Sequence, residues 1–277
     1  MIVEEVGAAR TEVLERIQQG LDLAVEALKP FVPGNIRADQ KSGGRGPVTE
    51  ADRMVGEVLR EALVRGGEGW FSEETPDDFE RLARRQVWVV DPIDGTRDLV
   101  AGVPEWCISI GLVEDGCAIA GGVLNPSTGE RFLGSAETGV LYNGRAARAT
   151  QRASLEGAVV LASRHEMERG EWARFSHEPF TIKPVGSIAY KLALLSAGLA
   201  DATWTFSPKH EWDIAGGVAL VEAAGGFALT LKGSPIVFNR RSSRLEGLIA
   251  AGPGLQEELP RFLRSVSHPP RKSDEQM

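Results

Sequence analysis

Apolar residues in the first third of the chain recur three or four positions apart, which is the spacing of amphipathic helices. The first run predicts a helix over residues 4–29 that ends at Pro30; its apolar positions are Val6, Val13, Ile17, Leu21, Ala24 and Leu28. A second helix is expected to begin near Thr49, because Thr49 and Asp52 have the spacing of a capping box. Its apolar side is predicted to consist of Val55, Val58, Leu59 and Ala62.

Beyond residue 100 the pattern changes to alternating apolar and polar positions interrupted by tight turns, which is typical of an antiparallel meander. The expected strands are 108–113, 118–124 and 131–133, with turns at 114–116, 125–126, 137–139 and 143–144. Residues 1–150 are therefore predicted to form an α+β lobe with helices over an antiparallel sheet.

The second half of the chain alternates strands and helices, which predicts a smaller α/β lobe over residues 151–266. The expected strands are 159–162, 181–185, 200–206, 227–231 and 248–251, and the expected helices are 166–175, 187–196, 214–224 and 255–266. The helix that ends at Ala224 is rich in glycine and alanine, so close packing is expected there. Residues 267–277 are polar, contain two adjacent prolines and are predicted to be a disordered tail.

Composition places the chain among ordinary soluble enzymes, with 277 residues, 42% apolar and 25% charged. No apolar run approaches the roughly 20 residues needed to span a bilayer, and the acidic N-terminus lacks a secretory signal, so we expect a cytoplasmic protein. A net charge of -8 argues against polymeric nucleic acid or an anionic membrane as a partner, but not against a small anionic metabolite. Cys107 and Cys117 lack metal-ligand spacing and are expected to be small buried hydrophobic residues.

The most informative stretch is an apolar run that ends abruptly in two carboxylates, Asp91 and Asp94. Pro92 stiffens the turn between them. A strand that delivers two aspartates from a rigid turn could hold a hard divalent cation. If Thr96 opens a helical turn, the amides of Gly95 and Thr96 are available to an anion.

Other acids gain interest from their order along the chain, although each has a structural alternative. Asp52 could simply complement a helix dipole, Glu73 could begin a solvated helix, and Asp213 could be the N-cap of the next helix. The Asp-Pro turn could likewise only cap a short helix. Taken together, their order and spacing favour one shared site.

The chain resembles the inositol monophosphatase family of magnesium-dependent, lithium-sensitive phosphatases. The resemblance rests on Val48-Thr49-Glu50-Ala51-Asp52, Ser72-Glu73-Glu74, Trp88 through Thr96, and Trp212-Asp213 with Gly225-Gly226. It implies a layered αβαβα architecture, a homodimer, and an active site between the two lobes.

The resemblance also implies a role for each matching residue. Ligands of the first Mg²⁺ would be Glu73, Asp91 and the carbonyl of Ile93, and those of the second would be Asp91, Asp94 and Asp213. A third, weaker ion would be supported through water by Asp52 and Glu73. The catalytic residues would thus be Asp52, Glu73 and Thr96, and the substrate-binding residues Lys41, Asp94, Gly95, Thr96 and Asp213.

Within these roles, Asp52 and Thr96 would orient and deprotonate the attacking water, and the amides of Gly95 and Thr96 would hold the phosphate. Lys41 would lie near the same end, in a glycine-rich segment up to Pro47. That segment lacks the Gly-Lys-Ser/Thr of a nucleotide loop and is more typical of a mobile lid.

The residue types also suit metal-dependent phosphate hydrolysis when the family resemblance is left aside. Oxygen ligands suit Mg²⁺, and two bridged ions can activate a water, clamp a phosphate and neutralise the leaving alkoxide. No Cys or His is placed as a covalent nucleophile, which favours direct attack by water.

The substrate is the open question, because the sequence departs from the family at positions near the leaving group. Inositol-hydrolysing members typically have a glutamate a few residues before Trp-Asp, whereas residues 205–210 contain no acid before Glu211. Arg97-Asp98 and Leu99 also replace more usual residues. Relatives that hydrolyse 3'-phosphoadenosine 5'-phosphate commonly have Glu-Trp-Asp.

Three functions remain in consideration. The first is Mg²⁺-dependent hydrolysis of a small phosphate monoester by metal-activated water, with inositol 1-phosphate as the default substrate. The second is a 3'(2'),5'-bisphosphate nucleotidase, in which Lys209 could read a second phosphate or be an ordinary solvated lysine. The third is a non-catalytic metabolite-binding regulator, which loss of a ligand or of Thr96 would favour; none is missing. A Rossmann nucleotide-binding module is excluded, since no Gly-x-Gly-x-x-Gly follows a strand.

Overall fold

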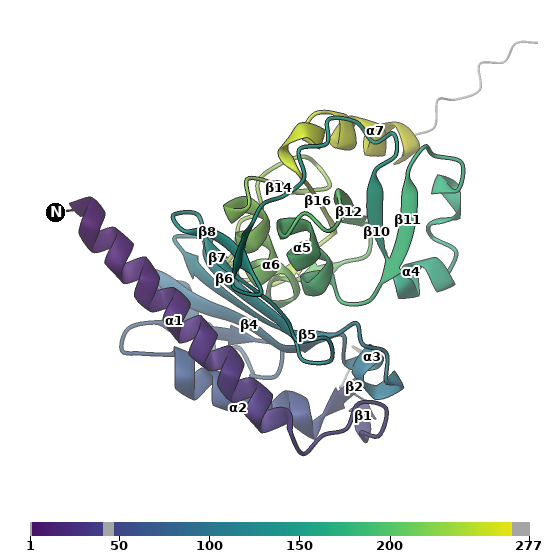
Figure 1. Cartoon of the computed structure of the whole chain (residues 1–277). Coiled ribbons are helices and arrows are strands. Elements are labelled where there is room, and N and C mark those ends of the chain that lie inside the picture. Colours follow the sequence, from purple (N-terminus) through teal and green to yellow (C-terminus); the bar gives the residue numbers. More distant parts are fainter. Residues whose placement is uncertain (1, 41–46, 268–277) are drawn as a thin grey trace, which may run out of the picture.

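Helices and sheets alternate in layers, in the computed structural model that describes residues 2–40 and 47–267 (Figure 1). One outer layer consists of α1 (Ile2–Leu28) and α2 (Glu50–Leu63), and the central helical layer consists of α5 (Ile188–Ser196) and α6 (Glu211–Ala223). A seven-stranded sheet separates these two layers, and a five-stranded sheet follows. The last layer includes α4 (Arg164–Glu168) and α7 (Glu258–Ser267). The predicted αβαβα architecture is confirmed.

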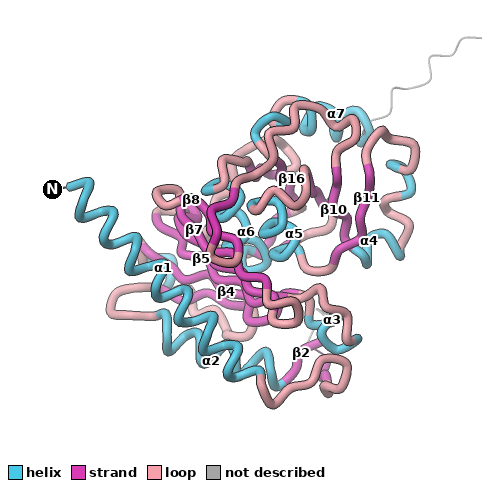
Figure 2. Tube along the Cα trace, viewed as in Figure 1, coloured by secondary structure: helices cyan, strands magenta, loops and turns pink. Residues whose placement is uncertain are grey.

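The seven-stranded sheet, drawn in magenta beside α1 and α2 in Figure 2, has its strands in chain order. They are β3 (Gly69–Ser72), β4 (Gln86–Asp94), β5 (Cys107–Glu114), β6 (Cys117–Asn125), β7 (Glu130–Ser135), β8 (Gly139–Tyr142) and β9 (Arg145–Ala147). All neighbours are antiparallel except β3 and β4, which are parallel. The expectation of a purely antiparallel sheet was wrong at this edge. A crossover through a short 3₁₀ helix (Glu80–Ala83), in place of a tight turn, connects these two strands.

The five-stranded sheet has the order β11-β10-β12-β16-β14. Its strands are β10 (Val159–Ser163), β11 (Thr181–Val185), β12 (Ala202–Thr205), β14 (Phe227–Thr230) and β16 (Leu248–Ala251). The helix predicted over residues 166–175 was wrong, because α4 ends at Glu168 and only a 3₁₀ turn, Ala173–Phe175, follows. Gly170 between them has a φ of 75°, which breaks the helix.

Helix α6 lies directly on the seven-stranded sheet because glycines face each other across the contact. A Cβ added at Gly121 would lie 2.3 Å from the carbonyl oxygen of Gly216, and one at Gly111 would lie 2.8 Å from Ala215. The predicted close packing is confirmed. One apolar core joins Phe71 and Val89 of this sheet to α5 and α6, although these helices belong to the second half of the chain. The lobe boundary near residue 150 stays a prediction.

The remaining elements are short. Hairpin strands β1 (Ala38–Gln40) and β2 (Pro47–Thr49) precede α2, while α3 (Thr96–Ala101) follows β4, and β13 (Lys209–His210) pairs with β15 (Arg244–Leu245). A 3₁₀ helix, Pro253–Leu255, precedes α7.

The two cysteines differ in their exposure to solvent. Cys107 is buried as expected, whereas Cys117 is exposed because it begins β6 directly after the β5–β6 turn. The predicted lid with Lys41 and the predicted tail lie outside the described residues, apart from Ser267, which ends α7. Within the described part of the chain, none of the helices is long and apolar enough to cross a membrane.

Candidate active site

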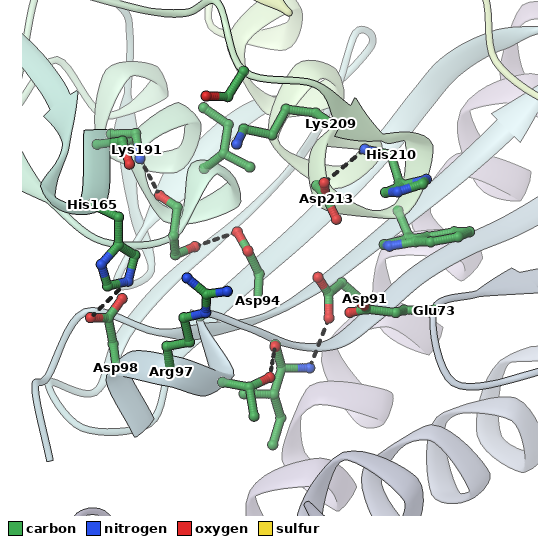
Figure 3. A pocket seen from close by; sticks show the side chains of 18 of the residues that line it. Glu73, Asp91, Asp94, Arg97, Asp98, His165, Lys191, Lys209, His210 and Asp213 are labelled. Atoms are coloured by element: carbon green, nitrogen blue, oxygen red, sulfur yellow. Dashed lines mark hydrogen bonds and ion pairs between the residues drawn. The ribbon is translucent and has the colours of Figure 1, made fainter. Parts of the chain in front are cut away.

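Strand β4 and the turn after it place Asp91, Asp94 and Thr96 on the wall of one cavity of about 420 Å³. The pairing of β4 with β5 shifts register between Asp91 and Asp94, so the chain bulges there. Asp91 Oδ1 accepts a hydrogen bond from the amide of Ile93 at 3.0 Å, which stabilises the bulge. Glu73 at the end of β3 and Asp213 of α6 line the same cavity (Figure 3).

Asp52 serves both the helix cap and the site. Its Oδ2 accepts from the amide and the hydroxyl of Thr49 at 2.7 and 2.5 Å, which completes the predicted capping box of α2. Its Oδ1 accepts from Thr96 Oγ1 at 2.9 Å. The structural and the functional explanations of Asp52 are therefore compatible, since each uses a different oxygen.

Gly95 has the backbone conformation that the turn into α3 requires. Its φ is 98°, and an added Cβ would lie 3.0 Å from Trp106 Cβ and 3.2 Å from the carbonyl oxygen of Glu105. Only glycine fits here without strain. As predicted, Thr96 is the first residue of a helical turn, with Gly95 as its N-cap, and both residues line the cavity.

Asp94 and Asp213 are each held by backbone amides. Asp94 Oδ2 accepts from Ser187 Oγ at 2.5 Å and from the amide of Ala189 at 2.7 Å. Asp213 Oδ2 accepts from the amide of His210 at 2.7 Å. The suggested N-cap role of Asp213 was wrong: His210 is the N-cap of α6, and Asp213 is the third helical residue.

The cavity concentrates negative charge on one wall. Burial, followed by the charges of Asp94 and Glu73, raises the pKa of Asp213 to about 8. A bound cation would relieve this repulsion, and the donor set consists of the carboxylate and carbonyl oxygens that Mg²⁺ prefers. Among residues 2–40 and 47–267, however, no group of three His, Cys, Asp or Glu side chains is close enough together to hold a metal ion. The number and identity of metal ions therefore stay a prediction.

The cavity is also lined by basic side chains, most of which the sequence did not reveal. They are Arg97, His165, Arg169, Lys191 and Lys209. Lys191 is 2% exposed, and its burial, followed by the charge of Lys209, lowers its pKa to about 8. Lys191 escaped notice because it lies within an otherwise apolar helical run, where a single lysine carries no signal.

Lys209 and Glu211 differ in what they contact. Lys209 is half-buried on β13 and lines the cavity, toward which its side chain points (Figure 3), so it is not a solvated loop lysine. Glu211 is fully buried and accepts from the amides of Asn239 and Arg240. It therefore stabilises the loop beside α6 and does not replace the glutamate that would meet inositol hydroxyls.

Known proteins resemble this chain in sequence over most of its length. Residues 4–267 match the model of the inositol monophosphatase family. The chain is 30% identical over 253 residues to the inositol-1-monophosphatase ImpA of Mycolicibacterium smegmatis, covering 87% of this chain and 88% of that protein. It is 30% identical over 200 residues to the fructose-1,6-bisphosphatase/inositol-1-monophosphatase of Thermotoga maritima, covering 70% and 75%.

A solved structure shows the same fold over nearly the whole chain. The extragenic suppressor protein suhB of Bartonella henselae superposes with a TM-score of 0.79 at 26% identity, covering 91% of this chain and 98% of that one. Sequence and fold thus agree on the same group of proteins. The chain belongs to the inositol monophosphatase family, which is a family of phosphatases.

Proposed function

We propose that this protein hydrolyses a small phosphate monoester by direct attack of water, with Mg²⁺ as its cofactor and inositol 1-phosphate as its default substrate. The observation that carries the proposal is the bond between Thr96 Oγ1 and Asp52 Oδ1, which connects a buried carboxylate to a hydroxyl on the cavity wall. Such a pair can accept a proton from a water molecule in the cavity.

The acidic wall supplies the ligands for the cation. Glu73, Asp91, the carbonyl of Ile93, Asp94 and Asp213 would hold two Mg²⁺ ions, and Asp52 with Glu73 would support a third through water. When bound, these ions supply Lewis acidity toward the phosphate and lower the pKa of a bound water.

The chain's own groups complete the reaction. Water gives a proton to the Thr96 hydroxyl as the Thr96 proton passes to Asp52, so that the pair stores one proton. The new P–O bond to the water oxygen forms while the P–O bond to the leaving alkoxide breaks. The amides of Gly95 and Thr96 at the start of α3 hold the phosphate oxygens. The leaving alcohol takes its proton from solvent in the open cavity.

Phosphate release from a panel of monoesters, measured with Mg²⁺ and with excess EDTA, tests this function. We expect turnover of at least one small polyol or sugar phosphate with Mg²⁺ and none with EDTA. Full activity in EDTA would rule out the metal-dependent mechanism. Binding of a metabolite without turnover of any ester would favour the non-catalytic regulator instead. The homodimer implied by the resemblance belongs to the proposal, and light scattering in solution tests it.

A basic side chain in the cavity supports a second candidate, hydrolysis of 3'-phosphoadenosine 5'-phosphate. Lys209 lines the cavity and points into it (Figure 3), where a second phosphate of the substrate would gain a charge-assisted contact. A neutral inositol ring would gain nothing from it. The lack of an acid between residues 205 and 210 favours the same candidate.

Comparison of kcat/KM for the bisphosphate and for inositol 1-phosphate decides between the two substrates. If Lys209 binds a second phosphate, Lys209→Ala should reduce kcat/KM for the bisphosphate by roughly ten- to a hundredfold and spare the inositol ester. Lys183→Ala, which removes an exposed lysine of β11, is the matched control. Equal small effects on both substrates would leave inositol 1-phosphate as the substrate.

A further inference from the structure

The N-terminus of α5 reaches across from the second half of the chain to hold Asp94. Ser187 Oγ and the amide of Ala189 both donate to Asp94 Oδ2, at 2.5 and 2.7 Å, although more than 90 residues separate them from it in the sequence. Two donors on one carboxylate oxygen fix the direction of the carboxylate. Hydrogen bonds to an ionised acceptor are about twice as strong as neutral ones, and a helix N-terminus adds a favourable dipole.

Ser187 adopts an unusual backbone conformation to make this contact. Its φ is 50° and its ψ is 126°, and a positive φ is strained for a residue with a side chain. In this conformation one hydroxyl makes three contacts: it donates to Asp94, accepts from the amide of Tyr190 at 3.0 Å, which caps α5, and lies 3.3 Å from Cys107 Sγ. The strained backbone of Ser187 therefore places its hydroxyl against Asp94, a candidate metal ligand.

Lys191 holds the strained segment in place from one helical turn further on. Its Nζ donates to the carbonyl oxygens of Ser187 at 2.9 Å and of Val185 at 3.2 Å. The residue between them, Gly186, donates its amide to Glu105 Oε2 at 2.7 Å. Residues 185–187 are thus tied on one side to α5 and on the other to the loop after α3.

The ammonium group of Lys191 makes no hydrogen bond to a carboxylate within the described part of the chain, although it is buried. A buried charge without a hydrogen-bonded carboxylate is costly, so packing does not account for a lysine here. A methionine would fill the same volume without that cost. What the lysine supplies beyond methionine is the pair of bonds to the Ser187 and Val185 carbonyls.

We propose that Ser187 and Lys191 are positioning residues that orient Asp94 as a metal ligand: Lys191 fixes the backbone of residues 185–187, and Ser187 with the Ala189 amide fixes the carboxylate. This rests on the proposed function in so far as Asp94 binds Mg²⁺. Neither side chain needs to touch the phosphate, and both act through Asp94.

Direct Mg²⁺ binding, measured by calorimetry without substrate, tests the role in metal binding. Ser187→Ala and Lys191→Met should weaken Mg²⁺ binding by roughly 10- to 100-fold, which is the usual effect of removing an outer support of a metal ligand. Ser196→Ala, which removes a buried hydroxyl of the same helix, and Lys183→Met are matched controls and should bind as the wild type does. Wild-type affinity in both test variants would overturn the proposal.

Ser187→Gly separates positioning from general stability. Glycine relieves the strain at φ 50° and also removes the hydroxyl. Compared with Ser187→Ala, we expect a higher Tm in metal-free buffer but equally weak Mg²⁺ binding. Recovery of Mg²⁺ binding together with the Tm would mean that the hydroxyl does not position Asp94, and that result would contradict the proposal.

A double-mutant cycle in EDTA tests the contact between Ser187 and Asp94 in the absence of metal. Unfolding of wild type, Asp94→Ala, Ser187→Ala and the double variant should show non-additive changes in stability, because the two residues share one strong hydrogen bond. Additive changes would show that Ser187 does not hold Asp94, and would overturn the proposal. If the wild type bound no Mg²⁺ and hydrolysed no ester, the proposed function would fail while this cycle still tested the contact.

Discussion

Thr96 Oγ1 lies 2.9 Å from Asp52 Oδ1, although 44 residues separate the two in the sequence. Thr96 begins α3 and Asp52 lies in the first turn of α2, so two helix starts meet at this bond. Asp52 is 1% exposed, which makes Thr96 its contact with the cavity. The hydroxyl is therefore the group through which Asp52 can act on water.

Removal of this hydroxyl should slow the chemical step. Thr96→Ala should lower kcat by roughly 10² to 10⁴-fold while changing KM far less, because general-base assistance acts in the transition state. Steady-state kinetics with the best ester of the panel measures both constants. Thr96→Ser keeps the hydroxyl and should retain much of the activity. A change confined to KM would mean that Thr96 only binds phosphate or caps α3.

The acidic wall should make turnover dependent on metal while it destabilises the metal-free protein. Asp91→Asn should abolish turnover and leave the Tm in EDTA unchanged or higher, because repulsion among the carboxylates is reduced. Phosphate release and thermal unfolding give the two readouts. Glu61→Gln, at an exposed glutamate of α2, should change neither. An active Asp91→Asn enzyme would exclude this mechanism.

Lys191 should make stability depend on pH above neutrality. Its pKa is lowered from 10.5 to about 8, first by burial and then by Lys209, whereas Asp94, Glu166 and Asp98 act in the opposite direction. Between pH 8 and 10.5 the unfolded chain binds more protons than the native one, so stability rises with pH in this window.

Comparison with Lys191→Met isolates this contribution from other titrating groups. The wild type should gain up to about 3 kcal/mol of unfolding free energy relative to the variant between pH 8 and 10.5. Denaturant unfolding at several pH values gives the difference. Parallel pH profiles for the two proteins would show that Lys191 titrates normally.

The contact between α6 and the sheet should tolerate no extra methyl group. Gly121→Ala places a Cβ 2.3 Å from a backbone oxygen of Gly216, which cannot rotate away, so we expect a loss of about 2–3 kcal/mol of stability. Since α6 carries Asp213, activity should fall as well. Gly66→Ala is the control, because no atom lies within 4 Å of its added Cβ. Equal stability of the two variants would contradict the close packing.

The periodic elements and the acids in their motifs could be predicted from the amino-acid sequence. The long helix α1, the capping box of α2 and the meander were predictable because each depends on residues close together in the chain. The paired aspartates after an apolar strand were found for the same reason. The helix predicted over residues 166–175 failed because Gly170 interrupts a run whose apolar spacing otherwise suits a helix.

Contacts between groups that are distant in the sequence depend on the tertiary structure and could not be predicted. The bond of Ser187 to Asp94, the bond of Thr96 to Asp52 and the burial of Lys191 beside the cavity join segments that no local pattern relates. The pKa values of Asp213 and Lys191 likewise depend on burial and on charges from other elements. Hydrophobic periodicity records which side of an element faces the core, whereas the partner across the core is set by how the layers pack.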